Sequence, residues 1–300
     1  MSAKREVPGP PDTRFSLIGH VIETGSTNAD LLAAAARGEP EGAVLVTDHQ
    51  TAGRGRQARS WHDEPGNSML MSVLLRPPPP VASLVPLIAG LAVTDGLDQL
   101  LGPVAPGGPV TPGSPVTPGS PVAPGGPVAP GGPVTPGGAV SLGPSRLALK
   151  WPNDVLVPEL GERKLCGILA EATTAGGPVS GLVVVLGMGL NLRWSSPPPD
   201  EIAQRAATLE DVAGQTIDRW LVVAAVLTHL DGWLNRAIED PATVLDRYRQ
   251  RCITLGRNVR MQTAAGILEG RAAAIAETGG LVLDTVDGPV VITAGDAHHL

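Results

Sequence analysis

A proline–glycine repeat in the middle of the chain sets the strongest limit on how these 300 residues can fold. From Pro103 to Gly138 the hexapeptide P-V-[A/T]-P-G-[G/S] occurs six times, without a charged or aromatic residue. Proline removes backbone donors and glycine is costly to order, so the repeat cannot build a packed core. Its period of six, without glycine at every third place, excludes collagen. We predict a flexible, partly polyproline-II insertion between two folded parts; a proline-rich ligand for a partner protein is the alternative interpretation.

The charge and cysteine content exclude several classes of protein. The net charge is −7 and the pI about 5.4, so no basic field points to nucleic acid or an anionic membrane. The cysteines, Cys166 and Cys252, lie far apart without CxxC spacing, which argues against a disulfide scaffold or a zinc site. The first residues, Met1–Pro11, contain no apolar stretch typical of a signal peptide. We expect a cytoplasmic protein that binds neither nucleic acid nor membrane.

Apolar periodicity on both sides of the repeat predicts an α/β domain. An alanine-rich helix is expected over residues 27–37. Ser26 or Thr27 can cap its amino terminus, and Gly38 is expected to end it. Further helices are expected over 83–101, 218–238 and 241–251, and strands over 43–47, 68–75, 147–151, 167–172 and 182–192.

After residue 259 the pattern changes to short β-runs separated by glycine, which predicts a small barrel at the carboxy terminus. These runs cover residues 260–263, 267–275, 281–285 and 290–293. The expected organisation is a disordered tail over 1–14, a catalytic domain over 15–252 containing a disordered insertion over 103–144, and a carboxy-terminal domain over 253–300.

Two short segments combine glycine or proline with charged side chains. In QTAGRGRQARSW (Gln50–Trp61) two glycines alternate with arginines directly after a predicted strand. Glycine lets backbone amides approach an anion, and arginine offers a planar fork for carboxylate or phosphate. KWPND (Lys150–Asp154) presents Asn153 and Asp154 at the end of another strand, where α/β sheets tend to hold ligands. The first segment indicates a site for a multi-oxygen anion, and the second indicates an aspartate that holds Mg²⁺ or orients an amine. The alternative is that both segments are ordinary solvated turns.

Two later segments place glycine within predicted strands. RKLCGILAE (Arg163–Glu171) contains Lys164 at its start, and Gly167 would permit close backbone approach. Cys166 is open to two interpretations, a nucleophile or a small buried residue. The glycines of LGMGLNL (Leu186–Leu192) indicate a bulge or a backbone approached by ligand. A dinucleotide fingerprint is excluded, since the third glycine and the following helix are absent.

Together with TGSTNADLL (Thr24–Leu32), these segments resemble, in their order along the chain, the biotin–protein ligases. The resemblance runs from about Val21 to Leu192 and implies an α/β (α+β) mixed-sheet catalytic domain followed by an SH3-like β-barrel. It implies an ATP-dependent enzyme that activates biotin as biotinyl-5′-AMP and passes it to a lysine of the biotin carboxyl carrier domain of an acyl-CoA carboxylase. ATP and Mg²⁺ are the implied nucleotide and metal, with no tightly bound cofactor, and a monomer or weak homodimer is expected.

The resemblance also implies roles for individual residues. Those for biotin are Ser26, Thr27, Asn28, Gln50, Arg54, Gly55, Arg56 and Lys164. Those for the nucleotide are Arg54, Arg56, Trp61, Asn153 and Asn191. Lys164, Arg56 and Asp154 are the implied catalytic residues, and Asp154 is also the implied ligand of Mg²⁺. Positive charge suits this chemistry, because attack of a carboxylate on the α-phosphate brings two anions together.

The chain departs from the family pattern in three places. Gln57 and Ala58 stand where the loop usually continues as GRGRxG, so its mobility is expected to differ. The repeat precedes KWPND, where a short connection is usual, and is expected to loop out. Only about fifteen residues precede the catalytic domain, too few for a helix-turn-helix, so repressor activity is not expected.

Three other functions remain open at this point. A lipoate–protein ligase would share the fold and also form an acyl-adenylate, although the GRGR and KWPND segments favour biotin. An octanoyltransferase would need Cys166 as its nucleophile and no ATP. A non-catalytic protein that recruits partners through the repeat would leave the lysine, arginines and aspartate of these segments unexplained.

Overall fold

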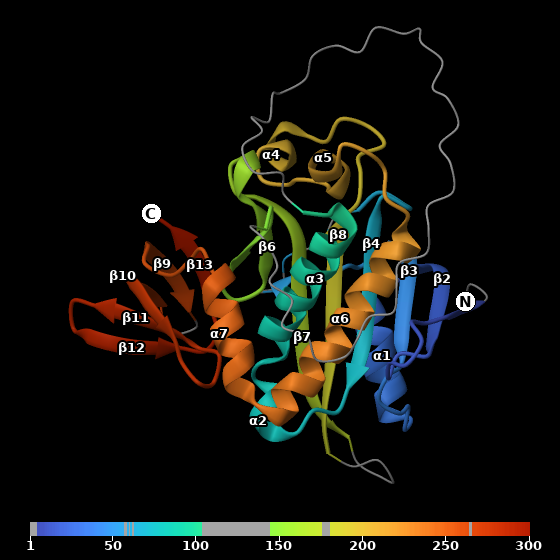
Figure 1. The fold of residues 1–300 in the computed structure, drawn as a ribbon, viewed down its shortest axis with the longest axis horizontal. Helices are drawn as coiled ribbons and strands as arrows, with labels where there is room; N and C mark the ends of the chain where they lie inside the picture. Colours follow the sequence, from blue (N-terminus) through green and yellow to red (C-terminus); the bar gives the residue numbers. More distant parts are fainter. Residues whose placement is uncertain are drawn as a thin grey trace, which may run out of the picture.

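The computed structural model describes residues 5–56, 59, 61, 63–103, 145–175, 181–263 and 266–300. The insertion predicted over 103–144 therefore lies, except for residue 103, outside the described residues. The described part forms two sheets and a set of helices (Figure 1). None of these helices is both long and apolar enough to cross a membrane.

The large sheet has eight strands in the order β1-β2-β3-β4-β8-β7-β6-β5. Strands β2 and β3 run parallel and every other neighbouring pair is antiparallel, so the predicted mixed sheet is confirmed. Its strands are β1 (Arg5–Pro8), β2 (Leu17–Thr24), β3 (Val44–Gln50), β4 (Ser68–Leu75), β5 (Ala148–Lys150), β6 (Asp154–Val157), β7 (Arg163–Ala175) and β8 (Gly181–Asn191).

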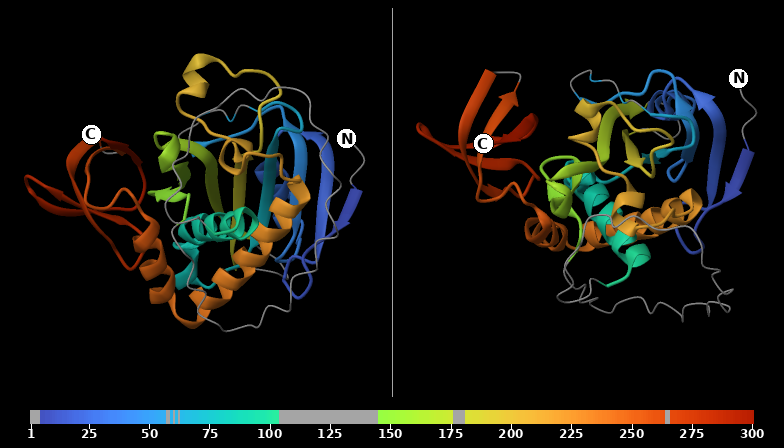
Figure 2. Two further views of the ribbon diagram at one scale, coloured as in Figure 1. Left: turned by 45° about the horizontal axis from the view of Figure 1, so that its top comes forward. Right: turned by 90° about the horizontal axis from the view of Figure 1, so that it is seen from above.

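Both faces of this sheet are covered, as the alternation of side chains along β8 shows. Val183 and Val185 pack with Leu31 and Ala35 of α1 (Thr27–Ala36), whereas Leu186 belongs to the main core on the opposite face. The main core is closed by α3 (Val85–Leu101) and α6 (Arg219–Glu239), which lie together on that face (Figure 2). The remaining helices are α2 (Pro79–Ala82), the 3₁₀ turn η2 (Pro158–Leu160), α4 (Asp200–Ala203), α5 (Leu209–Ala213) and α7 (Pro241–Arg251).

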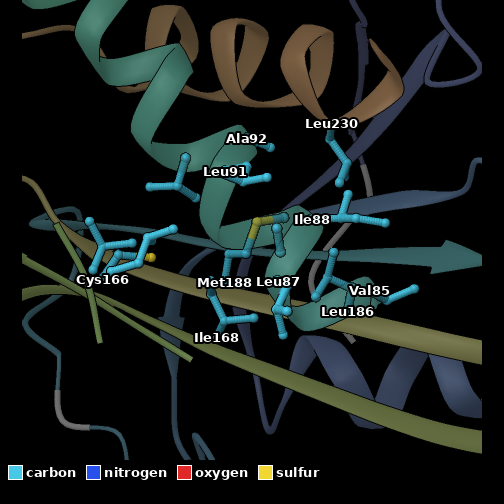
Figure 3. Packing of buried hydrophobic residues seen from close by; sticks show 14 of the residues in the cluster. Val85, Leu87, Ile88, Leu91, Ala92, Cys166, Ile168, Leu186, Met188 and Leu230 are labelled. Atoms are coloured by element: carbon cyan, nitrogen blue, oxygen red, sulfur yellow. The ribbon is translucent and has the colours of Figure 1, made fainter. Parts of the chain in front are cut away.

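Helix α3 has a broad apolar surface toward the sheet, and Figure 3 shows its side chains meeting those of β7 and β8. Leu91, Ile168 and Met188 are at most 2% exposed in this layer. Cys166 lies among the same packed side chains and is fully buried. The position of this cysteine therefore follows from core packing.

The carboxy-terminal strands form a separate five-stranded antiparallel sheet, which confirms a small β-domain at this end. Its order is β12-β11-β10-β9-β13. The strands are β9 (Asn258–Thr263), β10 (Gly266–Ile275), β11 (Leu281–Thr285), β12 (Gly288–Ile292) and β13 (Asp296–His299).

The two sheets share one hydrophobic core at the turn that joins β5 to β6. Trp151 in this turn is 1% exposed, and its indole Nε1 donates to the Gly279 carbonyl at 3.0 Å. Its backbone N–H donates to Thr254 Oγ1, and Ile253 N–H donates to the Leu149 carbonyl. The carboxy-terminal domain is thus fixed against the end of the large sheet where KWPND lies.

The predicted elements agree with the structure wherever apolar periodicity was strong. The strand over 68–75 and the helix over 241–251 have the expected ends. The disordered tail predicted over 1–14 is wrong for residues 5–8, which form β1 by backbone pairing with β2. Strands β2, β6 and β13 were not predicted, and β8 continues through Gly187 and Gly189 without the bulge proposed there.

Candidate active site

A pocket of about 520 Å³ opens where the start of α1 faces β7 and β8. Most of the side chains that the sequence predicted for biotin and nucleotide line it, although they come from four separate segments. Its lining includes Ser26, Thr27, Asn28, Gln50, Arg54, Gly55, Arg56, Trp61, Asn153 and Lys164. Asp154 and Asn191 do not line it; they face two neighbouring cavities described below.

Hydrogen bonds fix the inner end of this pocket. The Thr27 N–H and hydroxyl both donate to Gln50 Oε1, at 2.9 and 3.1 Å. Asn28 accepts from Ser72 Oγ at 2.6 Å and donates to Glu171 Oε2 at 2.7 Å. Among the described residues, the Ser26 hydroxyl and Gln50 Nε2 have no hydrogen-bond partner. A polar ligand therefore meets a preorganised wall with free donor capacity.

Arg54, Gly55, Arg56 and Trp61 of the glycine–arginine loop line the pocket. Gly55 N–H donates to the Arg59 carbonyl at 2.7 Å, and Trp61 N–H donates to the Gly53 carbonyl at 3.0 Å. Arg54 reaches Glu171 at 3.5 Å, and Arg56 donates to Asn153 Oδ1 at 3.2 Å. Burial lowers the pKa of the Arg56 guanidinium, although nearby aspartates oppose the change. A desolvated arginine here favours an anionic ligand.

Three glycines allow the aromatic and polar side chains of the site to lie directly on the sheet. A Cβ atom on Gly189 would stand 2.8 Å from Trp61 ring carbons, and one on Gly187 would collide with the Asn28 side chain. A Cβ on Gly167 would be 2.9 Å from Lys164 Nζ. The close approach that the sequence predicted at these glycines is therefore made by site side chains of the protein itself.

A second cavity, of about 600 Å³, lies between the large sheet and the carboxy-terminal domain. Asp154 faces it and forms an ion pair with Lys164, with 2.7 Å between Oδ1 and Nζ. Arg59 forms an ion pair with Asp296 of β13 on the opposite wall. Lys150, Asp296 and His298 line this cavity without having been predicted as site residues. Only tertiary packing brings the last strand of the chain here, so no local signal in the sequence identified it.

The third cavity is a wide groove of about 1250 Å³ beyond Trp61 and Lys164. Its walls are mainly apolar and include Trp194, Pro199 and Ile202. Asn191 borders this groove but is buried, and its Nδ2 donates to the carbonyls of Ala207 at 3.2 Å and Lys164 at 3.5 Å. It thereby helps to hold the backbone of Lys164 in place.

Lys164 occupies the junction of the three cavities. It lines all of them, as does Trp61, and its Nζ is 5.9 Å from the Trp61 ring centroid. The backbone N–H of Lys164 donates to the Arg205 carbonyl at 2.7 Å, and the Lys164 carbonyl accepts from the Ala207 backbone N–H at 2.9 Å. A lysine with a fixed backbone and a half-exposed ammonium is suited to meet an anion that spans the cavities.

Cys166 does not face any of these three cavities. Burial raises the pKa of its thiol to about 12, so the thiolate required of a nucleophile is disfavoured at neutral pH. The interpretation of Cys166 as a small buried residue is confirmed, and its use by an octanoyltransferase has no support in the geometry.

Similarity to known proteins covers both parts of the chain. Residues 20–189 match the biotin/lipoate A/B protein ligase family, and residues 254–300 match the biotin protein ligase C terminal domain. The biotin–[acetyl-CoA-carboxylase] ligase of Mycobacterium tuberculosis is 35% identical over 93% of this chain and 88% of its own length. The enzyme of the same name from Paracoccus denitrificans is 27% identical over 92% of this chain and 98% of its own.

The fold is also that of a solved protein. A biotin protein ligase from Aquifex aeolicus, in complex with biotin and ATP, superposes with a TM-score of 0.68 at 23% identity. The superposition covers 94% of this chain and 99% of the other.

Proposed function

The chain belongs to the biotin/lipoate A/B protein ligase family, and we propose that it is a biotin–protein ligase that forms biotinyl-5′-AMP and passes biotin to a carrier lysine. The observation that carries this assignment is the meeting of three cavities at Lys164 and Trp61. Three groups can occupy one cavity each and meet at this junction: a carboxylic acid, the adenine base of ATP and the phosphates of ATP. The similarity to biotin–[acetyl-CoA-carboxylase] ligases favours biotin over lipoate.

Biotin fits the first pocket by its chemistry. Its ureido ring carries donors and an acceptor, which match the inner wall of Ser26, Thr27 and Gln50. Leu70 and Leu169 pair with Gly189 and Gly187 across the sheet, so their side chains lie on the pocket face and can contact an apolar acyl chain. The carboxylate then points toward Lys164 and the arginines of the loop.

Adenylate formation brings the biotin carboxylate against the α-phosphate of ATP. The new bond joins a carboxylate oxygen to phosphorus, the bond between the α- and β-phosphates breaks, and pyrophosphate leaves. Lys164 and Arg56 oppose the repulsion between the two anions, and the burial of Arg56 strengthens its part of this effect. Gly55, Arg56 and Trp61 line the pocket and are placed to shield the mixed anhydride from water.

The apolar groove suits the adenine base. Trp61 and Trp194 offer aromatic faces there, and Ile202 and Pro199 complete an apolar wall. Asn191 supports this arrangement by holding the backbone of Lys164, in addition to the nucleotide contact expected of it.

Magnesium is expected to arrive with the phosphates. Among the described residues, no cluster of three or more His, Cys, Asp or Glu side chains offers a complete metal site. Asp154 faces the second cavity, and its carboxylate, which pairs with Lys164 through Oδ1, would hold a hard divalent ion there. The ion would neutralise phosphate charge there.

The second half-reaction transfers the acyl group to a carrier protein. The lysine amine of the carrier attacks the acyl carbonyl carbon, and the bond to the phosphate oxygen breaks, releasing AMP. Asp154 lies beside Lys164 at this junction and can orient the incoming amine. We propose the biotin carboxyl carrier domain of an acyl-CoA carboxylase as the partner.

We also propose a domain organisation with a catalytic domain over 15–252 and a carboxy-terminal domain over 253–300. The start of β9 at Asn258, directly after the contact between Ile253 and Leu149, supports this boundary.

Biotin-dependent exchange of labelled pyrophosphate into ATP is the test of the proposed function, with lipoate and octanoate measured in parallel. Exchange with biotin alone is expected. Exchange with lipoate alone would change the assigned substrate, and no exchange with any of the three acids would remove the adenylate chemistry.

Replacing Cys166 with serine is expected to leave biotin-dependent exchange close to the wild-type rate. The side chain is buried away from the three cavities, so the change acts on folding; the polar hydroxyl costs about 1–3 kcal/mol of the free energy of unfolding. Exchange rates measured below the melting temperature, together with urea denaturation, check both parts. Complete loss of activity in a folded variant would restore the nucleophile interpretation.

Deleting residues 103–138 is expected to leave biotinylation of a carrier largely intact. The site described above is built from residues on both sides of this segment, and the repeat carries no charged or catalytic side chain. Steady-state biotinylation by the deletion variant is the measurement. A folded variant without activity would show that the repeat takes part in the reaction.

A further inference from the structure

A chain of hydrogen bonds runs behind the inner wall of the first pocket and includes two residues, Ser72 and Glu171, that do not line it. Thr27 is bonded to Ser72 at 2.6 Å, Ser72 to Asn28 at 2.6 Å, and Asn28 to Glu171 at 2.7 Å. Ser72 of β4 is fully buried, whereas Thr27 and Asn28, at the start of α1, line the pocket. Ser72 and Glu171 can therefore affect a ligand only through the residues that they contact.

Glu171 sets the orientation of the Asn28 amide. A carboxylate can only accept a hydrogen bond, so the Asn28 atom that faces Glu171 Oε2 is the donor Nδ2. The same nitrogen donates to the Leu169 carbonyl at 3.4 Å, which favours the same orientation. The amide oxygen of Asn28 is thereby turned toward Ser72.

The direction of the chain continues from Ser72 to Thr27. Ser72 has one hydroxyl proton, which it donates to Asn28 Oδ1, so it can only accept from Thr27. The proton between the two hydroxyls therefore belongs to Thr27, and Gln50 Oε1, 3.1 Å from Thr27 Oγ1, shares it. Since this proton is held inside the protein, the Thr27 oxygen can only accept a hydrogen bond from a ligand.

A wall with this fixed direction distinguishes between ring systems. Gln50 Oε1 also accepts from the Thr27 backbone N–H at 2.9 Å, and among the described residues its Nε2 is left as a free donor. An acceptor on Thr27 beside a donor on Gln50 matches a cyclic urea, which carries ring N–H groups next to a carbonyl. The dithiolane ring of lipoate has neither group.

We propose that Ser72 and Glu171 are positioning residues of the biotin pocket, which fix Thr27 as an acceptor for a ring N–H of biotin. The inference rests on the proposed function. Neither residue touches the ligand. Their hydrogen bonds orient the wall before biotin arrives, so that less conformational freedom is lost on binding, and they thereby contribute to the selection of biotin over lipoate.

Replacing Ser72 with alanine tests this role most directly. The change removes both the acceptor that holds the Thr27 hydroxyl and the donor that holds the Asn28 amide. The Kd for biotin, measured by calorimetry without ATP, is expected to rise about ten-fold, the equivalent of one lost hydrogen bond. The KM for ATP and the kcat of exchange at saturating biotin are expected to stay near wild type, a division that general damage to the fold would not give.

Glu171→Gln tests the direction of the chain at nearly constant size. An amide at this position can donate as well as accept, so the orientation of Asn28 is no longer enforced and a similar rise in the Kd for biotin is expected. Glu171 also reaches Arg54 at 3.5 Å, and a second background separates this contact from the chain. In Arg54→Ala protein, Glu171→Gln is expected to raise the Kd by the same factor.

Ser68→Ala is the matched control for Ser72→Ala. Ser68 lies on the same strand, is 4% exposed and faces none of the three cavities. This variant is expected to bind biotin with the wild-type Kd.

Wild-type Kd values in both Ser72→Ala and Glu171→Gln would overturn the inference. A Ser72→Ala variant in which biotin affinity, the KM for ATP and kcat all deteriorate together would overturn it as well, by indicating a purely structural role. Failure of the wild type to bind biotin is a different result, and it would count against the proposed function.

Discussion

Replacing Lys164 with alanine is expected to lower the rate of biotin-dependent pyrophosphate exchange by about 10²-fold or more. Its ammonium lies where all three cavities meet, so it is placed to act on the carboxylate and the α-phosphate together. The loss also leaves the Asp154 carboxylate without its ion-pair partner, 2.7 Å away. An uncompensated negative charge would then repel both substrates and add to the effect.

The neighbouring residue provides a matched control for this experiment. Arg163 opens the same strand, is exposed and faces none of the three cavities, so Arg163→Ala removes the same charge without touching the site. This variant should exchange pyrophosphate at nearly the wild-type rate. Near-normal turnover in Lys164→Ala would remove Lys164 from the mechanism, whereas equal losses in both variants would point to the fold of β7.

The sequence predicted the parts of the site that lie within single segments. Arg54, Arg56 and Trp61 belong to one loop, and its alternating glycine and arginine indicate an anion site without knowledge of the fold. Lys164 gained significance only through the resemblance to the biotin–protein ligases, because a lone lysine at the start of a strand is usually solvated. The structure brings these residues together in one cleft.

Contacts between distant segments could not be predicted in this way. Asp296 and His298 reach the second cavity for two reasons: β13 pairs with β9, and Trp151 holds the carboxy-terminal domain through its hydrogen bond to the Gly279 carbonyl. The same limit applies to β1, where Arg5–Pro8 has no apolar alternation and is held by backbone pairing at the edge of the sheet. Apolar periodicity in the sequence indicates which side chains are buried, but it does not indicate which strands pair through their backbones.

The glycines of β8 show how a correct local signal can have a different cause. Gly187 and Gly189 predicted a bulge or an approaching ligand, but the strand is regular. Side chains of the protein fill the space instead, Asn28 over Gly187 and Trp61 over Gly189. A missing Cβ indicates that some atom comes close, and only the fold shows which one.

Trp151 was predicted as the end of a strand over 147–151 and as part of the KWPND segment; it follows β5 in the structure and has a role in stability. It is 1% exposed within the core that the two sheets share, and its Nε1 donates to the Gly279 carbonyl. The segment thus serves two purposes: Lys150, Asn153 and Asp154 face the cavities, and the tryptophan fastens the carboxy-terminal domain beside them.

Trp151→Ala is therefore expected to lower the free energy of unfolding by about 3–5 kcal/mol, the cost of removing a large buried aromatic side chain. Trp151→Phe keeps most of the packing and leaves the Gly279 carbonyl without its donor, so a loss of about 1–3 kcal/mol is expected. Trp194→Ala, in the half-buried wall of the groove, is the control and should lose far less. Urea denaturation gives the free energy of unfolding of each of the three variants, and these values are expected to fall in that order. A Trp151→Ala variant as stable as Trp194→Ala would show that the carboxy-terminal domain is held by its other links, such as the ion pair between Arg257 and Glu162 at 2.6 Å.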